Sequence, residues 1–154
     1  MTDPRGTLSS ETRLDLDALI DTLLPVAQNL LARYGEFHPF GAFMRSDGTI
    51  ELVAGYDGTD QPSNENLIEI LLGTLRTEAR GGELRAGGIC VRVRATPPDG
   101  SARTHAARLN LEHVSGAAVE VYLPYRRTIF RRFRYGDLFE APVSERSVGL
   151  GIRG

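Results

Sequence analysis

Two ionisable side chains stand close together in the segment with the densest local pattern, Tyr34-Gly35-Glu36-Phe37-His38-Pro39-Phe40-Gly41-Ala42. Glu36 and His38 are two positions apart, so on an extended strand their side chains point to the same side. A carboxylate and an imidazole that converge in a cleft can transfer protons or bind a small molecule. Glu36 and His38 are therefore the candidates for acid/base chemistry in this sequence.

The aromatic residues of the same segment favour a packing role instead. Phe37, Phe40 and Phe43 recur where a helix would turn into a hairpin, and aromatic contacts can fix such a corner. Gly41 would allow a close backbone approach there. We expect His38 to lie at this corner, outside any enclosed cavity, and we assign no catalytic residue.

Other metal-binding or nucleophilic groups are sparse. His105 and His113 would lie ~26 Å apart on one extended strand at ~3.3 Å per residue, too far to share a metal ion. Ser101 and Ser115 stand outside any G-x-S-x-G pattern. We therefore predict no metal and no cofactor.

Cys90 alternates with Arg92 and Arg94, a pattern that would lower its pKa if these side chains shared an exposed strand face. A half-buried cysteine in a strand is the alternative that we favour. As the chain's one cysteine, it cannot form an intrachain disulfide.

A run of arginines and aromatic residues lies between Tyr125 and Tyr135. We expect a possible interaction surface made of Arg126, Arg127, Arg131, Arg132 and Arg134. Single-stranded nucleic acids bind to such combinations of positive charge and aromatic rings. On one strand, however, Arg127 and Arg131 would face away from the other three, which divides the charge. We favour an edge strand that arginines protect from aggregation, or an ion-paired contact with acidic residues.

The composition and charge of the sequence indicate the class of protein to which these candidates belong. The 154 residues are 41% hydrophobic, which suits one globular domain. All 18 basic residues are arginine, and the first 90 residues carry a formal charge of −7 while the remainder carry +5. The opening residues lack the apolar stretch of a signal peptide, and no segment approaches the ~20 apolar residues of a membrane span. We expect a cytoplasmic protein with no membrane partner.

The elements follow from the spacing of apolar residues. Helical spacing predicts a helix over residues 15–34, kinked or restarted at Pro25 and capped by Gly35, and a second helix from Ser63 to Gly81. Asp47-Gly48 lies between two apolar runs, which indicates a hairpin. Alternation with period two predicts three strands between residues 89 and 123, a break at Pro124, and a fourth strand over 129–135.

The order is therefore α-β-β-α-β-β-β, with a further strand at the end. We predict an α+β fold in which one antiparallel sheet carries both helices on one face. The single domain would span residues 15–140, between a flexible arm (1–14) and a flexible tail (141–154). The order is similar to that of profilin-like and roadblock-like domains, a resemblance of topology alone.

The Tyr34–Ala42 segment, with Asp47-Gly48 and Thr96-Pro97-Pro98, also resembles small uncharacterised bacterial proteins that share a Tyr-Gly-Glu-Phe-(Tyr or His)-Pro-Phe segment. That resemblance implies no activity. We predict a non-enzymatic interaction or accessory module that binds a protein, with a second copy of the chain as one candidate. A ligand-binding or enzymatic corner at Glu36 and His38, and a nucleic-acid surface at Arg126–Arg134, remain the alternatives.

Overall fold

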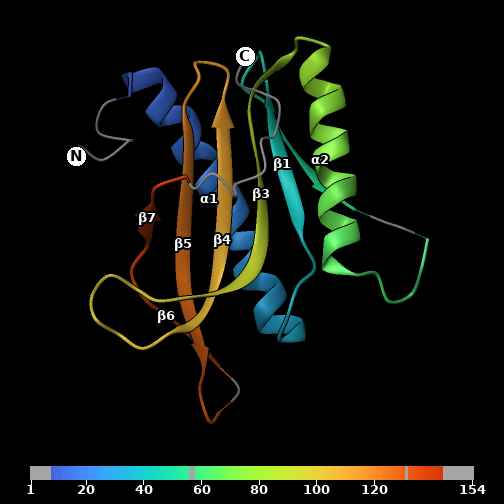
Figure 1. The fold of residues 1–154 in the computed structure, drawn as a ribbon. Coiled ribbons are helices and arrows are strands. Elements are labelled where there is room, and N and C mark those ends of the chain that lie inside the picture. The colour runs from blue at the N-terminus through green and yellow to red at the C-terminus, as the bar shows by residue number, and fades with distance from the viewer. Residues whose placement is uncertain (1–7, 56–57, 131, 144–154) are drawn as a thin grey trace.

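The computed structural model describes residues 8–55, 58–130 and 132–143. Within them the chain forms two helices and one antiparallel sheet of seven strands, which confirms the predicted α+β class and element order (Figure 1). The helices are α1 (Ser10–Tyr34) and α2 (Asn64–Arg80). The strands are β1 (Phe40–Arg45), β2 (Ile50–Ala54), β3 (Leu84–Ala95), β4 (Thr104–His113), β5 (Ala118–Arg127), β6 (Phe133–Tyr135) and β7 (Phe139–Ala141).

The sheet joins a hairpin to a meander. Its strand order is β2-β1-β3-β4-β5-β6, and β7 pairs with β5. The predicted Asp47-Gly48 turn closes the β1–β2 hairpin, where Gly48 has a φ of 90° and Asp47 accepts a hydrogen bond from the Thr49 N–H. Helix α2 then carries the chain from β2 at the edge to β3 beside β1.

Helix α1 begins earlier than its apolar stripe indicates. The Ser9 side chain accepts a hydrogen bond from the Thr12 N–H at 3.2 Å, so the helix starts at Ser10 and takes in part of the predicted arm. Residues 1–7 of that arm and 144–154 of the predicted tail lie outside the described residues. Gly35, with a φ of 76°, caps the other end as predicted.

Pro25 neither ends nor divides α1, which runs through it as one helix. Pro25 and Asp21, whose carbonyl loses its hydrogen-bond donor, both lie on the exposed side. Water can therefore replace the missing bond there. Neither described helix is long and apolar enough to cross a membrane.

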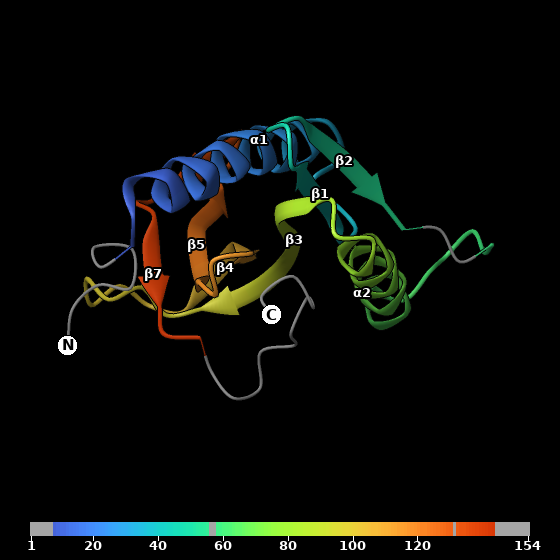
Figure 2. The same ribbon diagram turned by 90° about the horizontal axis from the view of Figure 1, so that it is seen from above.

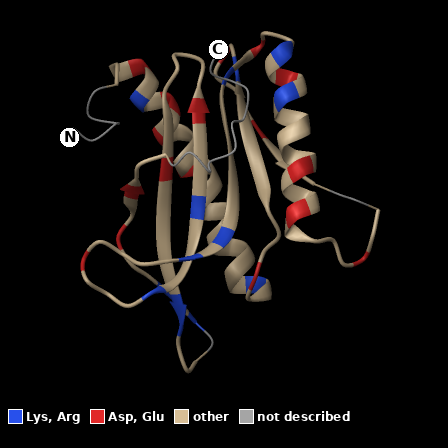
Figure 3. Ribbon diagram, viewed as in Figure 1, with Lys and Arg blue, Asp and Glu red and all other residues tan. Residues whose placement is uncertain are grey.

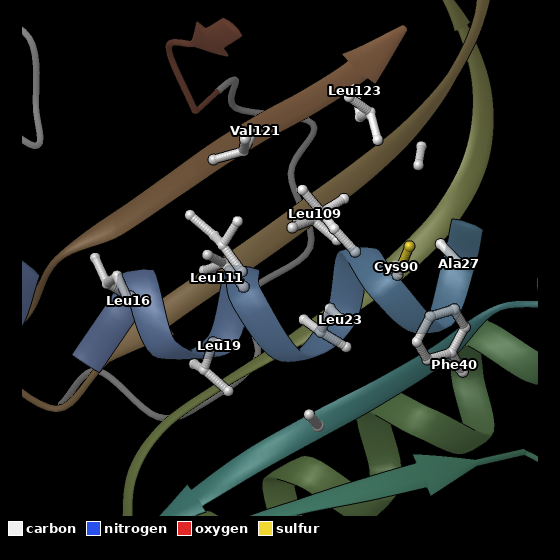
Figure 4. Close-up of a cluster of buried hydrophobic side chains, with 14 of the residues drawn as sticks. Leu16, Leu19, Leu23, Ala27, Phe40, Cys90, Leu109, Leu111, Val121 and Leu123 are labelled. Atoms are coloured by element: carbon white, nitrogen blue, oxygen red, sulfur yellow. The ribbon is translucent and has the colours of Figure 1, made fainter. Parts of the chain in front are cut away.

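The larger core lies between α1 and the sheet. Alternate residues of β1, β3, β4 and β5 point towards α1. Figure 4 shows the side chains of α1 in contact with those of the strands. The members labelled there are Leu16, Leu19, Leu23, Ala27, Phe40, Cys90, Leu109, Leu111, Val121 and Leu123. The apolar faces predicted for β4 and β5 therefore face α1, whereas Ile89 on the predicted apolar face of β3 packs on the α2 side.

Helix α2 lies against the other face of the sheet, so the prediction that both helices share one face is wrong (Figure 2). Phe40 of β1 packs in the α1 core, whereas its neighbour Phe43 packs with Leu71, Leu72 and Leu75 of α2. Because β1 is buried on both faces, it can carry a helix on each.

The predicted close approach at Gly41 is confirmed. A Cβ atom there would lie 2.7 Å from the carbonyl oxygen of Gly88 on β3. A Cβ on Gly88 would in turn collide with Leu111 and lie 2.9 Å from the carbonyl oxygen of Asn110. Glycine at both positions lets three neighbouring strands pack closely.

Strand β5 continues through Pro124, where the sequence predicted a break. The Pro124 carbonyl accepts a hydrogen bond from the Gly136 N–H at 2.9 Å, at the point where β6 has ended and β7 has not begun. The position of the missing N–H is on the same side as this carbonyl, away from β4, so the β4–β5 ladder loses no hydrogen bond. The predicted strand over 129–135 is also shorter than expected: β6 begins at Phe133, and Ile129 and Phe130 lie in a turn after β5.

Because the two buried cores are separate clusters, we expect substitutions in them to lower stability independently. Leu71→Ala and Leu109→Ala should each lower the free energy of unfolding by about 2–5 kcal/mol, because each empties a fully buried site. The two losses should add in the double variant, since the residues belong to different clusters. Urea denaturation measures these changes, with exposed Leu14→Ala as the control. Unchanged unfolding of both variants would contradict the described packing.

Candidate functional site

The Glu36 and His38 pair lies at the corner between α1 and β1, and both side chains are exposed. A guanidinium nitrogen of Arg92 lies 3.6 Å from the Glu36 carboxylate, and Arg92 Nε donates to the Phe37 carbonyl at 3.0 Å. Phe37 packs edge-to-face against Phe40 with ring centroids 5.7 Å apart. Glu36 thus helps to fix the corner, and nothing encloses it with His38. This geometry supports a packing role rather than proton transfer.

The other two histidines occupy unrelated positions. The His105 ring stacks on Tyr125 with centroids 5.7 Å apart, and His113 is buried beside α1. Among the described residues, no group of three or more histidine, cysteine, aspartate or glutamate side chains is arranged to hold a metal ion.

Cys90 points into the α1 core and is fully buried. Burial raises the pKa of its thiol, and the more distant charge of Arg108 opposes that effect only in part. Its predicted alternative as an activated thiol on an arginine-bearing face is therefore wrong. A thiol in this environment is a packing group.

A chain of hydrogen bonds that the sequence analysis did not identify connects α1 to the β4–β5 turn. His113 Nε2 lies 2.8 Å from Asp15 Oδ2, and His113 Nδ1 lies 2.9 Å from Ser115 Oγ. The Thr12 hydroxyl donates to Ser115 Oγ at 3.2 Å, and Arg85 lies 3.5 Å from the other Asp15 oxygen. Serine, histidine and aspartate thus line up in the order that hydrolases use.

Two features of this chain argue against nucleophilic catalysis. The Ser115 N–H already donates to His113 Nδ1 at 3.0 Å, so that nitrogen cannot accept the hydroxyl proton without competition. The Gly116 N–H donates to the His113 carbonyl at 2.9 Å. Neither amide is then free to stabilise an oxyanion. The chain fastens the first turns of α1 to the hairpin.

The arginine run forms the β5–β6 hairpin, which projects from one end of the sheet (Figure 1). Its turn is closed by a 2.7 Å hydrogen bond from the Thr128 N–H to the Arg132 carbonyl. Ile129 and Phe130 at the tip are 91% and 79% exposed. Arg131 lies outside the described residues.

The hairpin divides its arginines between the two faces of the sheet. Arg127 follows Tyr125 on the α1 side, where its guanidinium lies 5.7 Å from the centre of the Phe133 ring. Arg126 and Arg134 are directly opposite each other on the other side. Arg132 belongs to the turn. The predicted division of charge is therefore present, and each face has its own environment.

An open crevice of about 730 Å³ lies beside Arg126 and Arg134. The loop between β3 and β4 forms one wall, and the segment from Arg134 to Phe139 forms the other. No sequence pattern indicates it, because its walls are 30 or more positions apart and their approach depends on how β5 pairs with both β6 and β7.

The hydrogen-bond chain generates a stability prediction. His113→Ala should lower the free energy of unfolding by about 1–3 kcal/mol, because it removes a buried partner of Asp15. In the double variant Asp15→Ala, His113→Ala, the loss in unfolding free energy should be smaller than the sum of the two single losses. The reason is that each single variant already removes the same hydrogen bond. Urea denaturation with exposed His38→Ala as the control measures this coupling. Full additivity would show that the contact contributes nothing.

Comparison with known proteins adds no further evidence about this chain. No family model matches the sequence, and no match was found among curated proteins or solved structures. The resemblances to profilin-like topology and to the bacterial Tyr-Gly-Glu-Phe segment therefore stay predictions.

Proposed function

We propose that this protein is a non-enzymatic interaction module that binds an acidic protein surface through the tip of the β5–β6 hairpin. The observation that carries the proposal is the exposure of Ile129 and Phe130, two adjacent apolar side chains at a projecting turn. Burying side chains of this size in an interface is worth about 1.5–3 kcal/mol each. We further propose that the module works in the bacterial cytoplasm.

The base of the hairpin is well supported, which favours recognition by a preformed tip. Arg127 packs over Phe133, and a Cβ placed on Gly35 at the end of α1 would lie 3.6 Å from an Arg127 nitrogen. Within the turn, the Arg132 N–H also lies 3.3 Å from the Thr128 hydroxyl. A contact element held in this way loses little conformational entropy when it binds.

Charge favours a second copy of the chain as the partner. The arginines of β5 and β6 lie at one end of the sheet, whereas acidic residues lie on α1 and α2 away from that end (Figure 3). The first 90 residues carry −7 and the rest +5, so the acidic part of one copy complements the hairpin of another. A closed dimer would use this contact twice.

Sedimentation equilibrium tests this proposal. The wild-type chain should form dimers in the micromolar range at about 50 mM salt and dissociate as salt screens the charges. The double variant Ile129→Ser, Phe130→Ser should remain monomeric, because it removes the apolar contact and leaves the charge unchanged.

Val114→Ser is the matched control, since Val114 is 55% exposed on the β4–β5 turn and lies on a different hairpin. This variant should dimerise like the wild type. A monomeric wild-type chain throughout the micromolar range would refute self-association, and equal loss in the control would refute the role of the tip.

Nucleic acid is the second candidate partner, and one observation favours it: the sequence contains no acidic residue between Val121 and Gly136. Fluorescence anisotropy with a labelled single-stranded oligonucleotide at about 50 mM salt tests this candidate. Binding should weaken in Arg127→Ala, Arg132→Ala and fall steeply as salt rises, because phosphate contacts release counterions. Absence of binding at that salt concentration would eliminate this function.

A further inference from the structure

The crevice beside the hairpin has the features of a small-molecule site. Its volume of about 730 Å³ lies within the range of ligand pockets, roughly 300–1,000 Å³. Pro97 and Pro98 line the loop side, and Phe139, whose ring stacks on Tyr122 with centroids 5.0 Å apart, lines the opposite side. Tyr135 also borders the crevice, but it pairs with Tyr125 and packs on the α1 side. Flat rings and proline faces are the surfaces on which a planar group packs.

Its polar groups carry an unusual charge arrangement. Arg126 and Arg134 are directly opposite on neighbouring strands and both line the crevice, and Arg103 of the β3–β4 loop lines it as well. Like charges directly opposite each other destabilise a strand pair. None of the three arginines forms an ion pair with a residue that the structure describes. An anion held between Arg126 and Arg134 would remove the repulsion.

The carboxylates of Asp99 and Asp137 also line the crevice. Asp99 accepts a hydrogen bond from the Ser101 N–H at 2.8 Å, so it serves the loop's own turn. Hydrogen bonds from Ser101 lower the pKa of Asp99, which keeps this carboxylate ionised. Asp137 is exposed and could accept a hydrogen bond from a ligand hydroxyl or amino group.

We propose that this crevice binds a phosphate ester that carries a planar ring, of the nucleoside monophosphate type. The phosphate would lie between Arg126 and Arg134, with the ring against Phe139, which pairs with Tyr122 on the same face of the sheet as these arginines. A phosphate of charge near −2 neutralises two opposed guanidinium groups, whereas one carboxylate neutralises only half of that charge. The site is distinct from the hairpin tip, which lies beyond it.

Isothermal titration calorimetry with adenosine 5′-monophosphate as the probe tests the proposal. The wild-type chain should bind it with a Kd below about 1 mM. Arg134→Gln and Arg126→Gln should each weaken binding about tenfold, because each removes one side of the phosphate clamp. Arg103→Gln, on a separate loop, should also weaken it, and this variant leaves the β5–β6 pairing intact.

Arg127→Gln is the matched control, because it removes the same charge from the same hairpin on the opposite face. It should leave binding of the monophosphate unchanged, as should Ile129→Ser, Phe130→Ser. Adenosine and inorganic phosphate, titrated separately, should each bind at least about tenfold more weakly than the ester that joins them.

Three results would overturn the proposal: no binding by the wild-type chain, equal weakening by Arg127→Gln, or adenosine binding as tightly as its monophosphate. Inorganic phosphate binding as tightly as the ester would overturn the ring-bearing class. If Ile129→Ser, Phe130→Ser left the dimers intact, that result would contradict the proposed protein contact and would leave the monophosphate site untouched. The two proposals can therefore be refuted separately.

Discussion

The backbone of β1 at Gly41 approaches the Gly88 carbonyl of β3 so closely that a Cβ atom on Gly41 would lie 2.7 Å from its oxygen, and the remaining architecture depends on that contact. It places the β1–β2 hairpin beside the meander, although β1 and β3 are separated in sequence by α2. With β1 fixed in this position, its alternate residues face opposite ways. Phe40 completes the core under α1, and Phe43 begins the smaller core under α2.

Residues of β5 also alternate between the two faces of the sheet. This alternation determines which groups each arginine of the β5–β6 hairpin can contact. Tyr125 and Arg127 lie on the α1 side, and Arg126 lies on the other. A run that looks like one basic patch in the sequence is therefore two surfaces. On the α1 side, Arg127 packs over Phe133 and supports the hairpin. On the other side, Arg126 lines a crevice.

Local patterns predicted much of the fold, because the signals for helix caps and turns lie within a few residues. Gly35, Asp47-Gly48 and Ser63 act at the positions that their types indicate. The face that each helix covers could not be predicted, because it depends on how β1 pairs with a strand far along the chain. The Asp15–His113 contact joins residues 98 positions apart, and no spacing rule reaches that far. The continuation of β5 through Pro124 could not be predicted, because it depends on the imino nitrogen facing the junction of β6 and β7 rather than β4.

Helix α1 is fastened to the sheet near both ends and along the larger core, whereas α2 packs on the smaller of the two cores. His113 holds Asp15 near its start, Arg127 lies against Gly35 at its end, and the large core lies between them. Helix α2 packs on the smaller cluster, and Glu78 near its end lies 3.6 Å from Arg45 of β1. We therefore expect the free energy needed to detach α2 to lie below that of global unfolding, because fewer buried side chains hold it. Amide protection in α2 would report this partial opening, while protection in α1 would report the whole domain.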